Sequence, residues 1–149
     1  MTYQIIYSSE AATPMQQDDL EDILEQAHNS NAAQGITGAL VYAEGVFLQI
    51  LEGDRLKVQD LMARILRDLR HENVTVLREG DVACAAFGSW KMAYVSATAE
   101  QVAQWAGFSS TTQTPESLAE FGQDAQRTAQ FVQSILSVLV SESQRTQAD

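Results

Sequence analysis

Residues 35–53 read GITGALVYAEGVFLQILEG. Residues 36–42 alternate at the two-residue period of a β-strand, and residues 46–51 are apolar except for Gln49. The Glu44–Gly45 pair between the two runs is typical of a tight turn, because glycine readily takes a positive φ. The stretch therefore predicts a β-hairpin whose second strand is covered on at least one face.

Gln49 is the first candidate functional residue. A largely apolar strand flanked by glycines should direct this side chain into the core or into a pocket. Leaving its amide buried and unpaired would cost roughly 1–3 kcal/mol. A primary amide carries two donors and an acceptor, and rotation exchanges them in space. Gln49 could therefore recognise a ligand through hydrogen bonds, although the spacing alone favours an amide bonded to neighbouring backbone or lying on a solvated face.

Composition limits the class of protein and of partner. The chain has 149 residues, of which 45% are hydrophobic, so it should form one globular domain with a core that needs no disulfide. Its net charge of −11 disfavours nucleic acid or an anionic membrane as the main partner. A single cysteine, Cys84, without a secretory signal or a membrane-spanning apolar run, favours a reducing, cytoplasmic setting.

The N-terminal region predicts a strand followed by a helix. Residues 2–9 alternate, with Tyr7 on the same side as Ile5. A tyrosine there is more often a core ring, with its hydroxyl bonded at the rim, than a redox group. Between Pro14 and Asn31, three- and four-residue apolar spacing predicts an amphipathic helix. Its inward stripe continues onto Asn31, which either ends the helix or holds a ligand against the sheet.

A second helix is predicted after Gly53, with Asp54 as its N-cap. Its buried stripe should consist of Val58, Leu61, Met62, Ile65 and Leu69. Arg64, Asp68 and His71 should share an adjoining face. They would form either a surface ion pair worth about 0.3–0.5 kcal/mol or a set of donors and acceptors at a pocket edge. Basic residues are concentrated between positions 55 and 70, which is typical of a solvated face but also suits a phosphate-bearing cofactor.

Two further strands are predicted at residues 74–86 and 89–96. Trp90, Met92 and Tyr94 share one face of the second of these. An aromatic ring and a thioether on one face usually belong to a core, but they could also line the pocket of a planar ligand. The order of elements predicts an α+β fold, a ferredoxin-like βαββαββ arrangement with a five-stranded mixed sheet and two helices on one face.

The C-terminal third should be helical. A short helix is predicted at residues 98–106, and a last helix starts at Thr114–Pro115. Its heptad-like apolar positions are Leu118, Phe121, Ala125, Thr128, Val132, Ile135 and Leu139. The last helix should pack on the open face of the sheet, on a partner chain, or on both. We expect a core domain at 1–97, a helical extension at 98–142 and a polar tail at 143–149.

The chain resembles a BLUF domain, the flavin-binding sensor of blue light, over roughly residues 2–97. The segments that carry the resemblance are IIYSS with Tyr7, NAAQGITGALVY with Asn31, GVFLQILEG with Gln49, RILRDLRH with Arg64, Asp68 and His71, and FGSWKM with Trp90 and Met92. No single segment is specific. Together, in order and without insertion, they are strong support for the family.

The resemblance implies FAD as the physiological cofactor, held between the two helices, with FMN or riboflavin able to substitute. The cofactor contacts that it implies are Tyr7, Asn31, Gln49, Arg64, Asp68 and His71, with Ser30 among the outer contacts. It also implies that Tyr7 gives an electron and a proton to the light-excited flavin while Gln49 changes orientation or tautomer. Trp90 and Met92 would then pass the signal along the fifth strand. Because the flavin ends oxidised, nothing is turned over and the chain is not expected to be an enzyme.

The likeness extends to short BLUF proteins whose C-terminal helices are themselves the transmitter. We therefore expect self-association or a downstream protein partner through the face that contains Phe131, Ile135 and Leu139. Two other functions stay open. A flavin-dependent oxidoreductase would need a substrate space, and the sequence shows no dinucleotide fingerprint. A light-insensitive ligand-binding or interaction module would not explain why Asn31 and Trp90 also match.

Overall fold

The computed structural model describes residues 2–13, 16–88, 92–108 and 115–148, with the backbone alone for 115–116 and 142–148. The core elements are β1 (Thr2–Ala11), α1 (Gln17–Gln34), β2 (Thr37–Ala43), β3 (Val46–Gly53), α2 (Arg55–Leu66), β4 (His71–Val82) and β5 (Ala93–Ser96). Three further helices follow: α3 (Ala99–Ala106), α4 (Pro115–Gln123) and α5 (Ala125–Ala148).

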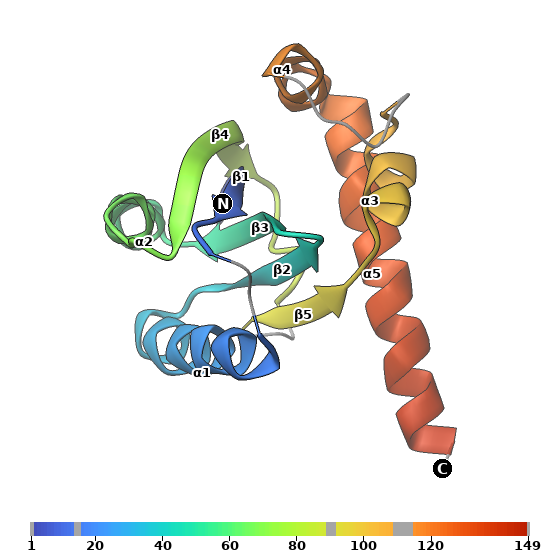
Figure 1. Ribbon diagram of the computed structural model, residues 1–149, viewed down its shortest axis with the longest axis horizontal. Helices are drawn as coiled ribbons and strands as arrows, with labels where there is room; N and C mark the ends of the chain where they lie inside the picture. The colour runs from blue at the N-terminus through green and yellow to red at the C-terminus, as the bar shows by residue number, and fades with distance from the viewer. Residues whose placement is uncertain (1, 14–15, 89–91, 109–114, 149) are drawn as a thin grey trace.

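The strands form one five-stranded sheet in the order β4-β1-β3-β2-β5. The β2–β5 pair is parallel and the other neighbours are antiparallel. The predicted ferredoxin-like mixed sheet is therefore confirmed. Figure 1 shows α1 and α2 beside one face of the sheet and α3, α4 and α5 beside the other. Each face is covered by its own hydrophobic core.

The predicted hairpin is formed by β2 and β3. Glu44 has φ 49° and Gly45 has φ 86°, so both turn residues are left-handed, and such turns match the twist of the flanking strands. The register places Gln49 opposite Tyr7 on β1 and opposite Leu40 on β2. Gln49 is thus in the middle of the sheet and not at its edge.

Helix α1 follows its predicted stripe. Leu20, Ile23 and Asn31 are its buried residues. The helix does not stop at Asn31 but continues to Gln34, and Gly35, with φ 70°, ends it in the left-handed conformation that glycine favours. Asn31 therefore presents a buried amide from within the last turn of the helix.

Helix α2 begins as predicted and ends early. The Asp54 carboxylate accepts a hydrogen bond from the Lys57 N–H at 3.3 Å, which caps the first turn. Val58 and Met62 are buried, but the helix ends at Leu66. The prediction that Leu69 is buried is wrong: its side chain is 90% exposed, because the chain has left the helix and the helical period no longer applies there.

The last two strands of the sheet are shifted relative to their predicted ranges. β4 starts at His71 and ends at Val82, whereas residues 74–86 were predicted. β5 starts at Ala93, and Met92 directly precedes it. Trp90 lies outside the described residues.

The predicted single C-terminal helix is two helices, α4 and α5, separated at Asp124. The Asp124 carboxylate accepts hydrogen bonds from the N–H groups of Gln126 (3.0 Å) and Arg127 (3.1 Å), so it starts a new helix at this point. Beyond Ser141 the polar sequence remains helical through Ala148.

The apolar stripe of α5 packs on the chain's own sheet. Phe131 and Ile135 are fully buried and Leu139 is 7% exposed, in the same core as Ile50 of β3. The predicted packing on the open face of the sheet is confirmed. The expectation that these three residues form a partner interface is wrong, because the sheet already covers them.

Candidate functional site

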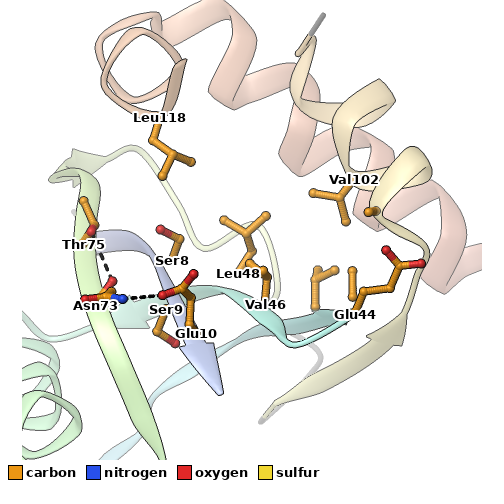
Figure 2. A pocket seen from close by; sticks show the side chains of 13 residues that line it. Ser8, Ser9, Glu10, Glu44, Val46, Leu48, Asn73, Thr75, Val102 and Leu118 are labelled. Carbon is orange, nitrogen blue, oxygen red and sulfur yellow. Dashed lines mark hydrogen bonds between the residues drawn. The ribbon is translucent and has the colours of Figure 1, made fainter. Parts of the chain in front are cut away.

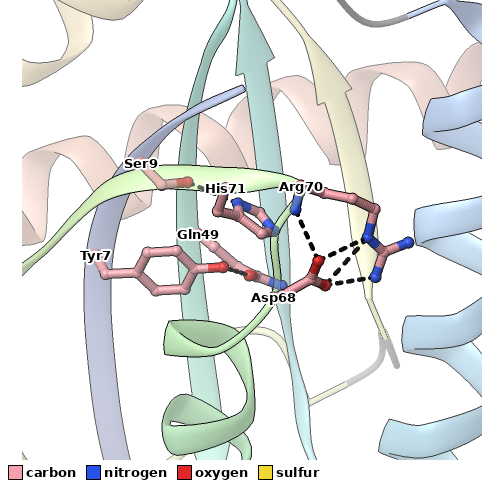
Figure 3. Close-up of polar contacts among 6 residues, drawn as sticks. All are labelled: Tyr7, Ser9, Gln49, Asp68, Arg70 and His71. Carbon is pink, nitrogen blue, oxygen red and sulfur yellow. Dashed lines mark hydrogen bonds and ion pairs between the residues drawn. The ribbon is translucent and has the colours of Figure 1, made fainter. Parts of the chain in front are cut away.

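Tyr7 and Gln49 form the centre of the site. The Tyr7 hydroxyl donates a hydrogen bond to Gln49 Oε1, and both side chains are buried (Figure 3). Burial, together with the negative charge of Asp68, raises the pKa of the Tyr7 phenol well above its usual value. Tyr7 therefore stays protonated at neutral pH and keeps its hydrogen available to the amide oxygen. The sequence expectation that Gln49 points inward is confirmed.

Met92 is the second neighbour of Gln49. Gln49 Nε2 donates to the Met92 sulfur at 3.3 Å, and the Met92 backbone carbonyl accepts from His28 Nε2 of α1 at 2.7 Å. A thioether sulfur can only accept a hydrogen bond. Both ends of the Gln49 amide are thus matched to their neighbours, and rotation of the amide would place its oxygen against the sulfur.

The turn after α2 carries an ion pair. The Arg70 guanidinium binds both oxygens of Asp68, with a shortest distance of 2.6 Å. These hydrogen bonds hold the pKa of the Asp68 carboxyl below its usual value. Of the two alternatives that the sequence left open for Arg64 and Asp68, the surface ion pair between them is not formed, because Arg64 pairs with Asp60 at 3.3 Å on the exposed side of α2.

His71 closes the site at the start of β4. Its Nδ1 shares a hydrogen bond of 2.8 Å with Ser9 Oγ, and its ring lies 5.0 Å from the Phe47 ring. Burial lowers the pKa of His71, although the Asp68 carboxylate acts in the opposite direction. The imidazole is therefore neutral at neutral pH and can act as both donor and acceptor.

Helix α1 forms the other side of the site. Asn31 is 1% exposed and Ser30, the residue before it, is half-buried. Tyr7 shares one hydrophobic core with Leu20 and Ile23 of this helix and with Met62 of α2. The structure thus brings Tyr7 and Gln49 to one side of the sheet, between α1 and the turn after α2.

Arg70 is a site residue that was not predicted from the sequence. Extending α2 to His71 would direct Arg70 away from Asp68, which lies two residues before it. The available signal was the segment Asp68-Leu69-Arg70-His71, in which three of the four residues are polar.

Glu52 was missed as well. It is fully buried, and its carboxylate accepts from the N–H groups of Ala86 and Phe87, both at 2.8 Å, and from Gln4 Nε2 at 3.1 Å. These bonds tie β3, three residues after Gln49, to the segment that leads towards Met92. A carboxylate in an apolar strand was the signal for a buried acceptor.

Residues 2–93 match the family model described as BLUF, sensors of blue light using FAD. The chain belongs to the BLUF family. BLUF domains are photosensor modules that bind a flavin, and this chain is therefore a blue-light flavin sensor and not itself a catalyst.

Relatives of this BLUF chain include much larger proteins. The photoactivated adenylate cyclase subunit beta of Euglena gracilis is 38% identical over 100 residues, which are 66% of this chain and 11% of that protein. A second protein of Euglena gracilis, the photoactivated adenylate cyclase subunit beta-like protein FB, is 37% identical over the same shares. The chain thus spans about a tenth of the length of these curated relatives.

Solved BLUF structures share the fold. The dark state of BlrB aligns with a TM-score of 0.72 at 21% identity, over 92% of this chain and 96% of that one, which shows the fold alone. The ground state of BlsA aligns with a TM-score of 0.68 at 30% identity, over 81% of this chain and 85% of that one.

The residues at the site fit the polar edge of a flavin ring, which presents carbonyl acceptors and an N–H donor. Asn31 and Gln49 each offer an amide with donors and an acceptor, and Arg70 and Asp68 add a donor group and an acceptor group.

Two features are absent from the described part of the chain. No cluster of three or more His, Cys, Asp or Glu side chains is placed to hold a metal ion. None of the helices combines the length and the apolar character needed to span a bilayer.

Proposed function

We propose that this BLUF protein senses blue light through a switch formed by Tyr7, Gln49 and Met92. The observation that carries the proposal is the hydrogen-bonded series from the Tyr7 hydroxyl to the Gln49 amide to the Met92 sulfur. When bound, the flavin supplies light absorption and an acceptor for one electron and one proton. Tyr7 is the group that releases both, and Gln49 Oε1 holds its hydroxyl in one direction.

Gln49 then changes orientation or tautomer. A rotated amide would direct Nε2 at Tyr7 and Oε1 at Met92, and the sulfur has no hydrogen to donate. The Met92 side chain must therefore move when the amide rotates. Since Met92 directly precedes β5, such a movement acts on the edge strand, against which α5 packs. Trp90 belongs to the same proposed transmission route.

We assign the cofactor contacts to Tyr7, Asn31, Gln49, Asp68, Arg70 and His71, with Ser30 at the outer edge. Arg70 replaces Arg64 in this assignment, because Arg70 binds Asp68 whereas Arg64 is exposed and paired elsewhere. FAD is the proposed physiological form, with FMN or riboflavin as substitutes. The description of the family supports FAD, and the basic residues of α2 offer partners for phosphate groups.

The output is proposed to reach a second copy of the chain or a downstream protein through the C-terminal helices, in a cytoplasmic setting. The apolar stripe of α5 is covered by the sheet, so the contact surface must be the outer side of these helices. Light must change the affinity for that partner, because equal affinity in the two states transmits nothing.

Absorption spectra of the purified protein, in darkness, after blue light and during recovery, test the switch. A reversible small red shift with oxidised flavin retained is expected for the wild type. The Gln49→Leu variant should bind flavin without the shift. A wild-type flavin spectrum that bleaches or never shifts would overturn the proposal, and rapid reduction by a nicotinamide nucleotide would favour an oxidoreductase instead.

A further inference from the structure

Glu52 is the only charged side chain that is buried among the described residues, and the proposed switch does not use it. Its carboxylate accepts hydrogen bonds from the N–H groups of Ala86 and Phe87, both at 2.8 Å, and from Gln4 Nε2 at 3.1 Å. A buried carboxylate is costly unless it is hydrogen-bonded. Hydrogen bonds to a charged acceptor are also roughly twice as strong as neutral ones. The carboxylate therefore holds its donors firmly in place.

Two of these donors belong to a turn outside the sheet. Residues 86–88 form this turn between β4 and β5. The hydrogen bonds to Glu52 attach its backbone to β3, the central strand of the sheet. The side chain of Phe87 is fully buried in the same core as Phe131 and Ile135 of α5. The turn is thus fixed both to the sheet and to the core under the C-terminal helices.

Glu52 and the switch lie on opposite faces of β3. Figure 2 shows Leu48 of β3 on the side of the sheet that faces Val102 of α3 and Leu118 of α4. Glu52 follows Leu48 by four residues, so the two-residue period of a strand places both on this face. Gln49 follows Leu48 directly and therefore points to the other face. Any link from Glu52 to the switch must pass from one face of the sheet to the other.

The chain makes this passage between Phe87 and Met92. Phe87 belongs to the core under the C-terminal helices, and Met92 belongs to the core under α1 and α2. Met92 comes five residues after Phe87, and a chain of that length spans at most about 18 Å. Fixing Phe87 therefore restricts where Met92 can lie. The backbone of Met92 is fixed as well, because its carbonyl accepts from His28 Nε2 at 2.7 Å.

We propose that Glu52 is a positioning residue of the light switch. Its carboxylate holds the turn at residues 86–88, and this turn, together with His28, sets the place of the Met92 sulfur beside Gln49. A displacement of Met92 acts on the turn in return and so reaches Phe87 and the core under α5. The effect on the light response rests on the proposed function, whereas the control of the Met92 position in darkness does not.

The methyl signal of Met92 reports its position in darkness. The chain has four methionines, and the signal that Met92→Leu removes from the ¹³C-methyl NMR spectrum of the flavin-loaded protein belongs to Met92. Glu52→Gln should shift this signal, because an amide N–H₂ then faces a backbone N–H of the turn. Gly122→Ala, which disturbs the contact between α4 and β4, should not. An unchanged signal in Glu52→Gln, or equal shifts in the two variants, would overturn the proposal.

Dark recovery after a blue flash tests whether Glu52 acts through Met92. Glu52→Gln alone should change the recovery rate several-fold, and Gly122→Ala should leave it nearly unchanged. In the Met92→Leu background, Glu52→Gln should have no further effect, since the sulfur that it positions is absent. The same factor in both backgrounds would show that Glu52 acts by another route and would refute the role. A wild-type recovery rate in Glu52→Gln would refute it as well.

Gln4→Met provides a second test for the case in which Glu52→Gln does not fold. It removes one hydrogen bond of the carboxylate and leaves the two bonds to the turn. A small shift of the Met92 signal with a changed recovery rate supports the proposal, and wild-type values of both refute it. A wild-type protein without a red shift would contradict the proposed switch, and the Met92 signal in darkness would still decide whether Glu52 positions Met92. The two failures are therefore distinguishable.

Discussion

Gln49 donates a hydrogen bond to the sulfur of Met92 while it accepts one from Tyr7. The amide is thereby held between a group that can donate and a group that can only accept. This asymmetry stabilises one orientation of the amide in the dark. It also makes Met92 the residue that must respond when the orientation changes.

Met92→Leu should retain flavin and the light-induced red shift but change the rate of dark recovery. Leucine has a similar volume but no acceptor atom, so the variant lacks the Gln49–Met92 hydrogen bond that rotation of the amide breaks in the wild type. We expect a several-fold change, since a weak hydrogen bond contributes roughly 0.5–1.5 kcal/mol. Recovery of absorbance after a blue flash measures this rate. A recovery rate equal to that of the wild type would exclude Met92 from the switch.

Arg70→Ala should weaken flavin binding about tenfold to a hundredfold, the loss expected for hydrogen bonds from a charged group. Arg64→Ala is the matched control, because Arg64 is exposed and pairs with Asp60. Fluorescence titration of the apoprotein with FAD gives both dissociation constants. A larger loss in Arg64→Ala than in Arg70→Ala would restore the assignment made from the sequence.

Glu52→Gln should lower the free energy of unfolding by about 1–3 kcal/mol. One carboxylate oxygen becomes an amide N–H₂ that faces a backbone N–H of Ala86 or Phe87, so a buried donor loses its acceptor. Urea unfolding monitored by circular dichroism measures the effect. Glu72→Gln, at an exposed position of β4, should be nearly neutral. Equal stability of the two variants would mean that the hydrogen bonds of Glu52 to Ala86 and Phe87 do not stabilise the fold.

Gly122→Ala should destabilise the contact between α4 and β4. A Cβ atom at Gly122 would lie 1.9 Å from the Leu77 carbonyl oxygen, so the helix would have to move away from the strand. The expected cost is about 1–3 kcal/mol, that of overpacking a tight contact. Gly88→Ala serves as the control, since the nearest atom there is at 3.8 Å. Thermal unfolding that does not distinguish the two variants would contradict this close packing.

Acidification should lower stability through His71. Burial holds the pKa of His71 in the folded chain below its usual value of 6.5, so between the two pKa values the unfolded chain binds more protons than the folded chain. The stabilising contribution is complete above pH 6.5 and is lost as the pH falls from there to the folded pKa. Urea unfolding between pH 7 and pH 5 measures the slope, and His71→Asn should reduce it. A slope that is unchanged in this variant would assign the pH dependence to other groups.

Local periodicity determined most of the secondary structure. The alternation in residues 36–42 and the turn at Glu44–Gly45 define the hairpin, because strand faces and positive φ are properties of neighbouring residues. The same holds for the inward direction of Gln49 and for the buried Asn31 on α1. The order of segments then identified the family before any contact was known.

Only the tertiary structure decided where α2 ends and which arginine meets Asp68. The helical pattern continues in the sequence past Leu66, but the chain must turn to bring His71 into pairing with β1. That turn exposes Leu69 and brings Arg70, not Arg64, to Asp68. Long-range contacts likewise select Met92 as the partner of Gln49. Such contacts depend on how distant segments pack, and the spacing of residues along one segment does not encode that packing.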